Sequence, residues 1–245
     1  HKEAVASRSL AFMEGMQGAG VMANAKHFPG HGDTDSDSHK TLPTINFSKE
    51  RIDSLELYPY KSLFLKGLSS VMVAHLNVPS LDARSNYPSS LSYPIVTELL
   101  KEKLGFKGLI FTDALDMKGA SNFSNPGEVD LQAFLAGNDV MLMSVDVGQG
   151  INTLQKAVES RVISEERLAH SVKKILSAKY KVGLSQFEPI NTHDLVADLN
   201  RQKDDVLYQN LMENAITLVE NKNDLLPLKN LELLKIAYVN MGSAD

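Results

Sequence analysis

Three histidines and three aspartates stand close together between Lys26 and Pro43, in a stretch with few apolar residues (KHFPGHGDTDSDSHKTLP). Asp37 and His39 are two residues apart, so in an extended loop both side chains can face the same way and form a hydrogen bond. A carboxylate partner favours the protonated imidazole, which makes His39 a candidate proton donor near neutral pH. Lys26 and His27, at the end of the preceding apolar run, could bind hydroxyl groups. Most isolated Asp-x-His pairs are solvated turns, but the position after a strand favours chemistry here.

A second candidate lies in the segment GLIFTDALDM, residues 108–117, where Asp113 directly follows a run of apolar residues. An ionisable side chain at the carboxyl end of a buried strand is a candidate nucleophile. The alternative is that Asp113 caps the helix that follows. Because the same chain also carries the 26–43 loop, we favour catalysis over capping.

The same loop could be suspected of binding a metal. Asp recurs at every second position over residues 33–37, as in a calcium loop, but Ser38 stands where that loop has Gly and Thr44 where it has Glu. His27 and His31 are four residues apart, but Pro29-Gly30 between them is hard to reconcile with the helix that would align them on zinc. We therefore predict no metal and no other cofactor.

Four short apolar runs, each about as long as a buried strand, alternate with helical patterns. The runs cover residues 21–28, 71–76, 109–115 and 140–143, and the helical patterns cover 49–67, 94–104, 127–137 and 150–160. Alternation of this kind predicts an α/β fold with a parallel sheet. Polar segments follow the first three runs, at the edge of such a sheet where ligands bind.

In the remaining third of the chain, the sequence predicts one long helix and then the start of a separate unit. Residues 164–182 have the pattern of a helix that Ser164 caps, with an apolar stripe along it. After a polar segment we expect a helix near 203–214 and short strands at 216–219 and 236–239, as the opening of another unit.

Composition limits the partners. The chain of 245 residues is 43% hydrophobic with a net charge of −5, and no block of Lys and Arg suggests nucleic-acid binding. No apolar run is long enough to span a bilayer, and the absence of Cys excludes disulfides, zinc–thiolate sites and Cys nucleophiles. The chain starts without Met in a helical pattern (Leu10, Met13, Met16), so we expect a fragment or a processed product.

Read in order, KHFPGHG, the Asp37-Ser38-His39 triplet and GLIFTDALDM resemble glycoside hydrolase family 3, especially its β-N-acetylhexosaminidases. VMVAHLNVPSLD (71–82) and GNDVMLM (137–143) add weaker support. The resemblance extends over residues 1–185. It implies retaining hydrolysis of terminal β-N-acetylglucosaminides, derived from peptidoglycan or chitin, through a double displacement.

Carried over by position, the resemblance implies a role for five residues. Asp113 is the nucleophile, His39 the acid/base and Asp37 its partner, while Lys26 and His27 bind sugar hydroxyls. In β-glucosidases of this family the acid/base is typically a carboxylate from elsewhere, so the Asp-Ser-His triplet favours the acetylhexosaminidase branch. A histidine repels an incoming anion less than a carboxylate does, so phosphate could replace water as the acceptor.

The family's catalytic domain is a (β/α)8 barrel, usually with several strands before the Lys-His segment. The resemblance therefore implies that residues 1–185 are the C-terminal half of a TIM barrel, 186–215 a linker and helix, and 216–245 the start of a C-terminal α/β sandwich. Half a barrel exposes edge strands, so we expect association with the rest of the parent barrel or with itself, and weak or no activity of the fragment alone. A bacterial periplasmic, extracytoplasmic or cytoplasmic location is left open.

Other functions remain as alternatives at this point. The runner-up enzymes are a β-glucosidase and an N-acetylglucosaminide phosphorylase of the same family. A non-enzymatic carbohydrate-binding protein is another, although Asp37, His39 and Asp113 are all present and Trp is absent. Metal-dependent hydrolysis at His27, His31 and Asp33 is the last.

Overall fold

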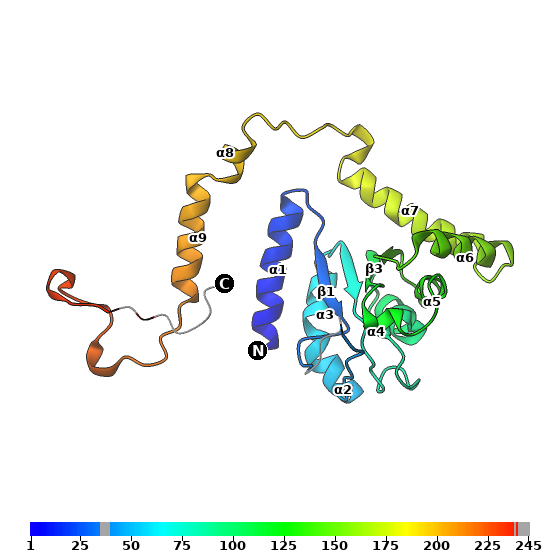
Figure 1. Ribbon diagram of the computed structural model, residues 1–245, viewed down its shortest axis with the longest axis horizontal. Helices are drawn as coiled ribbons and strands as arrows, with labels where there is room; N and C mark the ends of the chain where they lie inside the picture. Colours follow the sequence, from blue (N-terminus) through cyan, green and yellow to red (C-terminus); the bar gives the residue numbers. More distant parts are fainter. Residues whose placement is uncertain (35–39, 238, 240–245) are drawn as a thin grey trace. The chain divides into compact units, whose positions relative to one another are not determined.

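The first part of the chain is built on a parallel sheet. The computed structural model describes residues 1–34, 40–237 and 239, and the chain divides into two units, 1–187 and 188–245. The sheet of the first unit has the strand order β1-β2-β3-β4 (Figure 1). Its strands are β1 (Asn24–Phe28), β2 (Ser70–Val73), β3 (Leu109–Ala114) and β4 (Val140–Leu142), and every neighbouring pair is parallel. The predicted α/β class with a parallel sheet is confirmed.

The register of the sheet aligns the carboxyl ends of its strands. Phe28 of β1 is level with Val73 of β2, and Val73 is level with Thr112 of β3. Phe28, Val73 and Thr112 are all fully buried, which fits the near-continuous apolar runs that predicted these strands. The residues next to this level, His27 on β1 and Asp113 on β3, consequently come to the same edge of the sheet.

Helical segments connect the strands, as the alternating pattern predicts. They are α2 (Lys49–Arg51), η1 (Ile52–Glu56) and α3 (Tyr58–Leu65) before β2; η2 (Ser89–Leu91) and η3 (Pro94–Lys103) before β3; α4 (Lys118–Ser121) and α5 (Glu128–Ala136) before β4; and α6 (Val147–Glu159) after it. Helix η3 is a π-helix that begins at Pro94, where the missing N–H costs no helical hydrogen bond.

The helix predicted over 49–67 is divided rather than continuous. Ser48 caps its first turn by accepting a hydrogen bond from the N–H of Arg51, and the helix then runs as a π-helix to Glu56. A new helix starts beside Pro59. Because Pro59 has no N–H, it cannot donate to a carbonyl of the preceding turn, and the helical hydrogen bonds restart there.

Helix α1 (Lys2–Gly18) packs against α3 beside strand β1 (Figure 1). Met13 is 4% exposed, and Leu10 and Met16 pack against the same core, so the predicted apolar face is confirmed. At the end of this helix the side-chain oxygen of Gln17 accepts hydrogen bonds from the N–H and the hydroxyl of Ser69. These bonds tie the helix to the start of β2.

The helix predicted over 164–182 is present as α7 (Glu165–Lys181), followed by the short η4 (Leu184–Gln186). Ser164 accepts a hydrogen bond from the N–H of Arg167, as a capping residue does, and Glu165 and Glu166 lie in the first turn. The predicted cap and helix are therefore confirmed.

A buried polar cluster holds α7 against the sheet. The carboxylate of Asp139, which has no exposed side-chain surface, accepts hydrogen bonds from Ser171, from Lys174 and from the N–H of Ile110. Residues of the predicted apolar stripe are less buried, and Leu176 is 58% exposed. In this structure the polar cluster therefore anchors the helix more than the stripe does.

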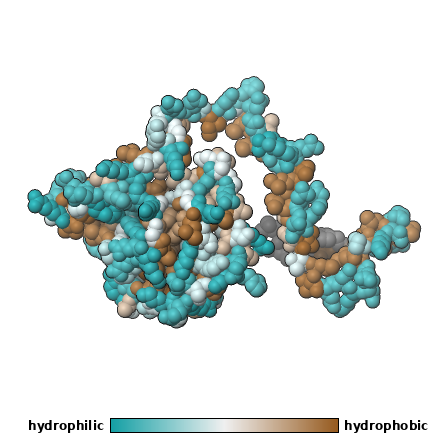
Figure 2. Space-filling model, turned by 180° about the vertical axis from the view of Figure 1, so that it is seen from behind, coloured by the Kyte–Doolittle hydropathy of each residue, from teal (hydrophilic) through white to brown (hydrophobic). Residues whose placement is uncertain are grey.

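The second unit contains helices but no core among its described residues. Its elements are α8 (Leu195–Leu199), α9 (Gln202–Ala215), η5 (Lys222–Asp224) and η6 (Leu231–Leu233), and none carries a buried residue. Apolar side chains lie on the surface of the segment that carries α9 (Figure 2). Leu207 and Leu211 are 57% and 61% exposed.

The strand predicted at 216–219 is wrong, and the described residues of 236–239 form no strand either. Ile216 and Val219 are 76% and 93% exposed. A short apolar segment becomes a strand only when a neighbouring strand satisfies its backbone groups, and the described part of this unit offers none. Nor is any helix in the described parts of the chain both long and apolar enough to cross a membrane.

Candidate functional site

Two of the predicted site residues meet at the carboxyl edge of the sheet. The Nε2 atom of His27, the second-last residue of β1, lies 3.7 Å from Oδ2 of Asp113, near the end of β3. Strand β2 separates the two strands, so the side chains reach across it. The side chain of His27 is 29% exposed and that of Asp113 is 13% exposed. A group that enters from the open side can therefore reach both.

The carboxylate of Asp113 is oriented by the backbone of the next residue. Its Oδ1 atom accepts a hydrogen bond of 2.9 Å from the N–H of Ala114, which leaves Oδ2 to face His27. The alternative that Asp113 caps the next helix is wrong, since α4 begins at Lys118 with Met117 as its N-cap. The carboxylate is thus held at one oxygen and presented at the other.

Burial lowers the pKa of His27, and the charges of Lys26 and His31 lower it further, while Asp113 acts in the opposite direction. The net direction is downward, so the ring is neutral at pH 7. A neutral imidazole can both donate and accept a hydrogen bond, which suits contact with hydroxyl groups. Lys26, also on β1, is exposed and adds a cation beside this ring.

The two ends of the loop after β1 are described, but Asp37 and His39 lie outside the described residues. At the near end, Nδ1 of His31 is 2.9 Å from the hydroxyl of Thr34. At the far end, the N–H of Asn77 donates to the carbonyl of Pro43 and the N–H of Ile45 donates to the carbonyl of Asn77. Asn77 follows β2, so the far end of the loop is fixed at the carboxyl edge of the sheet.

His27, His31 and Asp33, the residues of the metal-dependent alternative, do not converge on one point. The rings of His27 and His31 are 5.9 Å apart at 72°. The carboxylate of Asp33 instead accepts a hydrogen bond of 2.7 Å from the guanidinium of Arg51, which stacks on Phe47. Among residues 1–34, 40–237 and 239, no group of three or more His, Asp or Glu side chains could hold a metal ion together.

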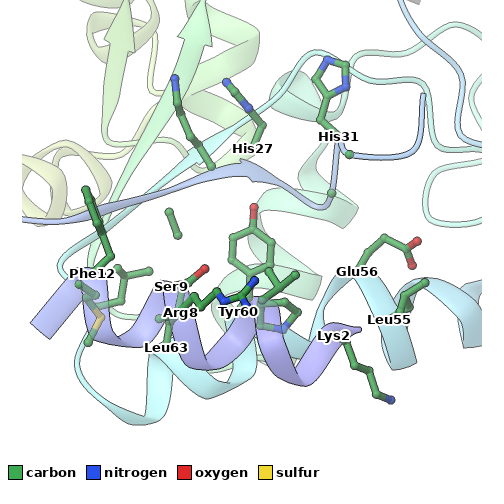
Figure 3. Close-up of a pocket in the computed structure, with 18 of the residues that line it drawn as sticks. Lys2, Arg8, Ser9, Phe12, His27, His31, Leu55, Glu56, Tyr60 and Leu63 are labelled. Atoms are coloured by element: carbon green, nitrogen blue, oxygen red, sulfur yellow. The ribbon is translucent and has the colours of Figure 1, made fainter. Parts of the chain in front are cut away.

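A cavity of about 990 Å³ flanks β1 on the side of helices α1 and α3. Figure 3 shows Tyr60 and Leu63 of α3 with Arg8 and Phe12 of α1 on one side of the β1 segment, and His27 on the other. Asp113 does not line this cavity. Lys26 and His27 do line it, so the cavity reaches the part of β1 that carries two of the candidate site residues.

Sequence reasoning missed His75, which stands just after β2 and is fully buried. Its Nε2 atom is 2.9 Å from the carbonyl oxygen of Ala114, the residue after Asp113. A histidine within the apolar run VMVAHL was a signal in itself, because a buried imidazole needs polar partners. Those partners belong to segments far along the chain, and the sequence pattern does not reveal them.

Comparison with known proteins gives consistent matches. The family model described as glycosyl hydrolase family 3 N terminal domain matches residues 1–178. The chain is 31% identical to beta-hexosaminidase A of Pseudoalteromonas piscicida, over 92% of this chain and 40% of that protein. A 36% identical match to a beta-hexosaminidase of Neisseria meningitidis serogroup C covers 58% of this chain and 38% of that protein. The chain thus spans about two fifths of the length of these curated relatives.

Solved structures show the same similarity. A glycoside hydrolase family 3 beta-N-acetylglucosaminidase from Paenibacillus sp. str. FPU-7 superposes with a TM-score of 0.83 at 36% identity, over 90% of this chain and 42% of that one. The beta-glucoside phosphorylase BglX superposes with a TM-score of 0.85 at 25% identity, over 93% of this chain and 43% of that one.

Proposed function

The chain belongs to glycosyl hydrolase family 3, and from this membership we propose that it supplies the catalytic face of an enzyme that hydrolyses terminal β-N-acetylglucosaminides with retention. The observation that carries the proposal is the approach of His27 Nε2 to Asp113 Oδ2, at 3.7 Å, on the carboxyl edge of a parallel sheet. Parallel α/β folds bind ligands at that edge. The similarity to a solved beta-N-acetylglucosaminidase supports the N-acetylated sugar, and the similarity to beta-hexosaminidases supports a hexosaminide.

In the proposed first step, Oδ2 of Asp113 attacks the anomeric carbon and forms an ester bond to the sugar. The bond from that carbon to the glycosidic oxygen breaks, and His39 gives this oxygen a proton. Oδ1 remains bound to the N–H of Ala114, so the attacking oxygen is the one that faces the open site.

In the proposed second step, water attacks the same carbon from the side the leaving group has vacated. His39 takes the proton of the water, and the ester to Asp113 breaks and restores the carboxylate. Two displacements at one carbon retain its configuration. The roles of His39 and its partner Asp37 follow from the family resemblance alone, since both lie outside the described residues.

Lys26 and His27 bind sugar hydroxyls in this proposal. His27 is neutral at pH 7, so it can donate to one oxygen or accept from another, while exposed Lys26 donates only. Contacts of this kind hold the anomeric carbon at Asp113, which is where orientation lowers the barrier.

We also propose that the four-stranded sheet is half of a (β/α)8 barrel, with residues 186–215 as linker and helix and 216–245 as the start of a sandwich domain. The relatives are longer than this chain, and β1 and β4 each have one strand neighbour within the described residues. The chain alone is accordingly weak or inactive, and full activity belongs to a parent protein, meaning a longer protein that contains these residues. Comparing the turnover of the two tests this; equal rates would refute it.

A second candidate function is phosphorolysis or hydrolysis of a β-glucoside, which the similarity to a beta-glucoside phosphorylase supports. The experiment that separates the candidates measures turnover of aryl N-acetylglucosaminide and aryl glucoside by the parent protein, with and without inorganic phosphate. The main proposal predicts free N-acetylglucosamine as the product and no gain from phosphate. Formation of a sugar 1-phosphate would instead show that the enzyme is a phosphorylase.

A further inference from the structure

Behind the proposed nucleophile lies a histidine that takes no part in the double displacement. His75 follows strand β2 and has 0% exposed surface. Substrate cannot reach a ring with no exposed surface, so any contribution to the reaction must pass through neighbouring protein groups. Its ring nitrogens form hydrogen bonds with Ala114 and Ser90.

These contacts assign the tautomer of the ring. Nε2 is 2.9 Å from the carbonyl oxygen of Ala114, and a carbonyl can only accept, so Nε2 carries the hydrogen and donates it. In the neutral ring Nδ1 then accepts, at 2.7 Å, from the hydroxyl of Ser90. Burial lowers the pKa of His75 against the smaller raising effects of the Ala114 carbonyl, Asp113 and Asp116, which favours this neutral form.

Ser90 is itself held in place. Its backbone carbonyl accepts a hydrogen bond of 2.8 Å from the side chain of Asn138, which is fully buried. His75 is consequently fixed at both ring nitrogens by groups that cannot move without disturbing the core.

His75 is connected to the proposed nucleophile through one residue, Ala114. The carbonyl of Ala114 accepts from His75 and from the N–H of Met117, while the N–H of Ala114 donates to Oδ1 of Asp113. Both backbone groups of Ala114 are therefore engaged, one with the histidine and one with the carboxylate. The orientation of Ala114 therefore affects the direction in which the other oxygen of the Asp113 carboxylate points.

The hydrogen bond from His75 reaches β3 where its pairing with β4 is irregular. The register between β3 and β4 shifts between Phe111 and Ala114, so the ladder is irregular on the approach to Ala114. On the other side of β3, the hydrogen bond from His75, in the segment after β2, holds the chain at that point. Without it, Ala114 would keep only the turn bond from Met117 on its carbonyl.

We propose that His75 is a positioning residue: by holding the Ala114 carbonyl it fixes the direction in which Asp113 presents Oδ2 to the sugar. The inference rests on the proposed role of Asp113 as nucleophile. It adds a residue from the segment after β2 to a site whose described members, His27 and Asp113, lie on β1 and β3.

The test compares His75→Leu, His75→Gln and Ser90→Ala in the parent protein, with an aryl N-acetylglucosaminide as substrate. His75→Leu removes the donor, and we expect kcat to fall about 10- to 100-fold, as for a reacting group displaced by about 1 Å. KM changes little, because the sugar ligands remain. His75→Gln, whose amide N–H can reach the same carbonyl, recovers much of the loss. The pH profile of kcat keeps its shape, since the ring does not titrate in the reaction.

Controls separate positioning from general stability. Ser70 is 3% exposed and donates to the carbonyl of Ala23 at the far end of β2, so Ser70→Ala removes a buried hydrogen bond away from the site and should leave kcat unchanged. If His75→Leu does not fold, Ser90→Ala replaces it, with an expected loss of a few-fold in kcat because one hydrogen bond to the ring is removed.

The outcomes are distinct for the two proposals. Full kcat in folded His75→Leu, or in folded Ser90→Ala when it replaces that variant, would overturn the positioning role. A shifted limb of the pH profile would overturn it as well, because it would make His75 a titrating participant. An active Asp113→Asn would instead remove the nucleophile on which the inference rests. Loss in His75→Leu with recovery in His75→Gln supports positioning.

Discussion

The Nε2 atom of His27 lies 3.7 Å from Oδ2 of Asp113, although strand β2 separates the strands that carry them. The other oxygen of the carboxylate is bound to the N–H of Ala114. An aspartate held in this way has one oxygen free for reaction and a neutral imidazole beside it.

Replacing this carboxylate should remove turnover without removing the fold. In the parent protein, we expect Asp113→Asn to lower kcat by at least about a thousandfold, because an amide is a poor covalent nucleophile. Asp116→Asn is the matched control, since Asp116 is an exposed carboxylate three residues further along the same segment. Steady-state kinetics of both variants measures the loss of turnover, and thermal unfolding checks that both are folded. Equal losses in the two variants would argue against a special role for Asp113.

Stability should depend on pH through the buried histidines. Burial lowers the pKa of both His27 and His75 below the ordinary value of 6.5. Between the lowered values and about 6.5 the unfolded chain binds more protons than the folded chain, so the free energy of unfolding falls as pH falls through this window. The slope is at most about 1.4 kcal/mol per pH unit for each histidine.

Urea unfolding at a series of pH values between 7.5 and 5 would measure this slope, and His75→Gln should flatten it. A free energy of unfolding that rises on acidification below pH 6.5 would contradict the direction of both shifts. An unchanged slope in His75→Gln would show that other groups cause the dependence.

The anchor of α7 should contribute strongly to stability. Removing one partner of a buried ion pair leaves the other uncompensated, so Asp139→Ala should cost about 3–5 kcal/mol in the free energy of unfolding. Asp53→Ala is the control, because Asp53 pairs with Lys61 and Lys103 at the surface, where such pairs contribute about 0–1 kcal/mol. Denaturant unfolding measures both. Similar costs would mean that the Asp139 cluster does not hold the helix.

Residues 188–245 should not fold cooperatively when produced alone. No described residue of this unit is buried, so little apolar surface is available to offset the entropy of ordering the chain. Helix α9, with 14 residues, is marginal in isolation. We expect partial helicity by circular dichroism and a broad, non-cooperative melt. A sharp thermal transition would show that the segment forms a core by itself.

The sequence predicted helices and strands well where the signal is strong and lies within a short segment, as for an apolar run or a capping residue. The runs that became β2 and β3 are apolar because both strands are central in the sheet, and Ser164 revealed the start of α7 through capping chemistry. The segment 216–219 has the same apolar composition as a strand, yet it has no strand partner in the described residues. An apolar composition indicates that a segment should be buried. Whether a neighbouring strand is present to pair with it depends on the fold.

The site divides in a similar way. Asp113 and His27 were predictable because each ends an apolar run at the edge where ligands bind. Their proximity across β2 depends on register, which a one-dimensional pattern does not contain. His75 was missed because its partners, Ser90 and Ala114, come from other segments and one of them is a backbone carbonyl.

The proposed mechanism stands on one covalent bond, between Asp113 and the sugar. The direct measurement is to incubate the parent protein with a fluorinated N-acetylglucosaminyl fluoride that forms the glycosyl-enzyme faster than it is hydrolysed, and to locate the label by peptide mass spectrometry. We predict one sugar per protein molecule, attached within residues 108–117 at Asp113 and absent in Asp113→Asn. A label on another residue, or turnover without any trapped label, would contradict the account.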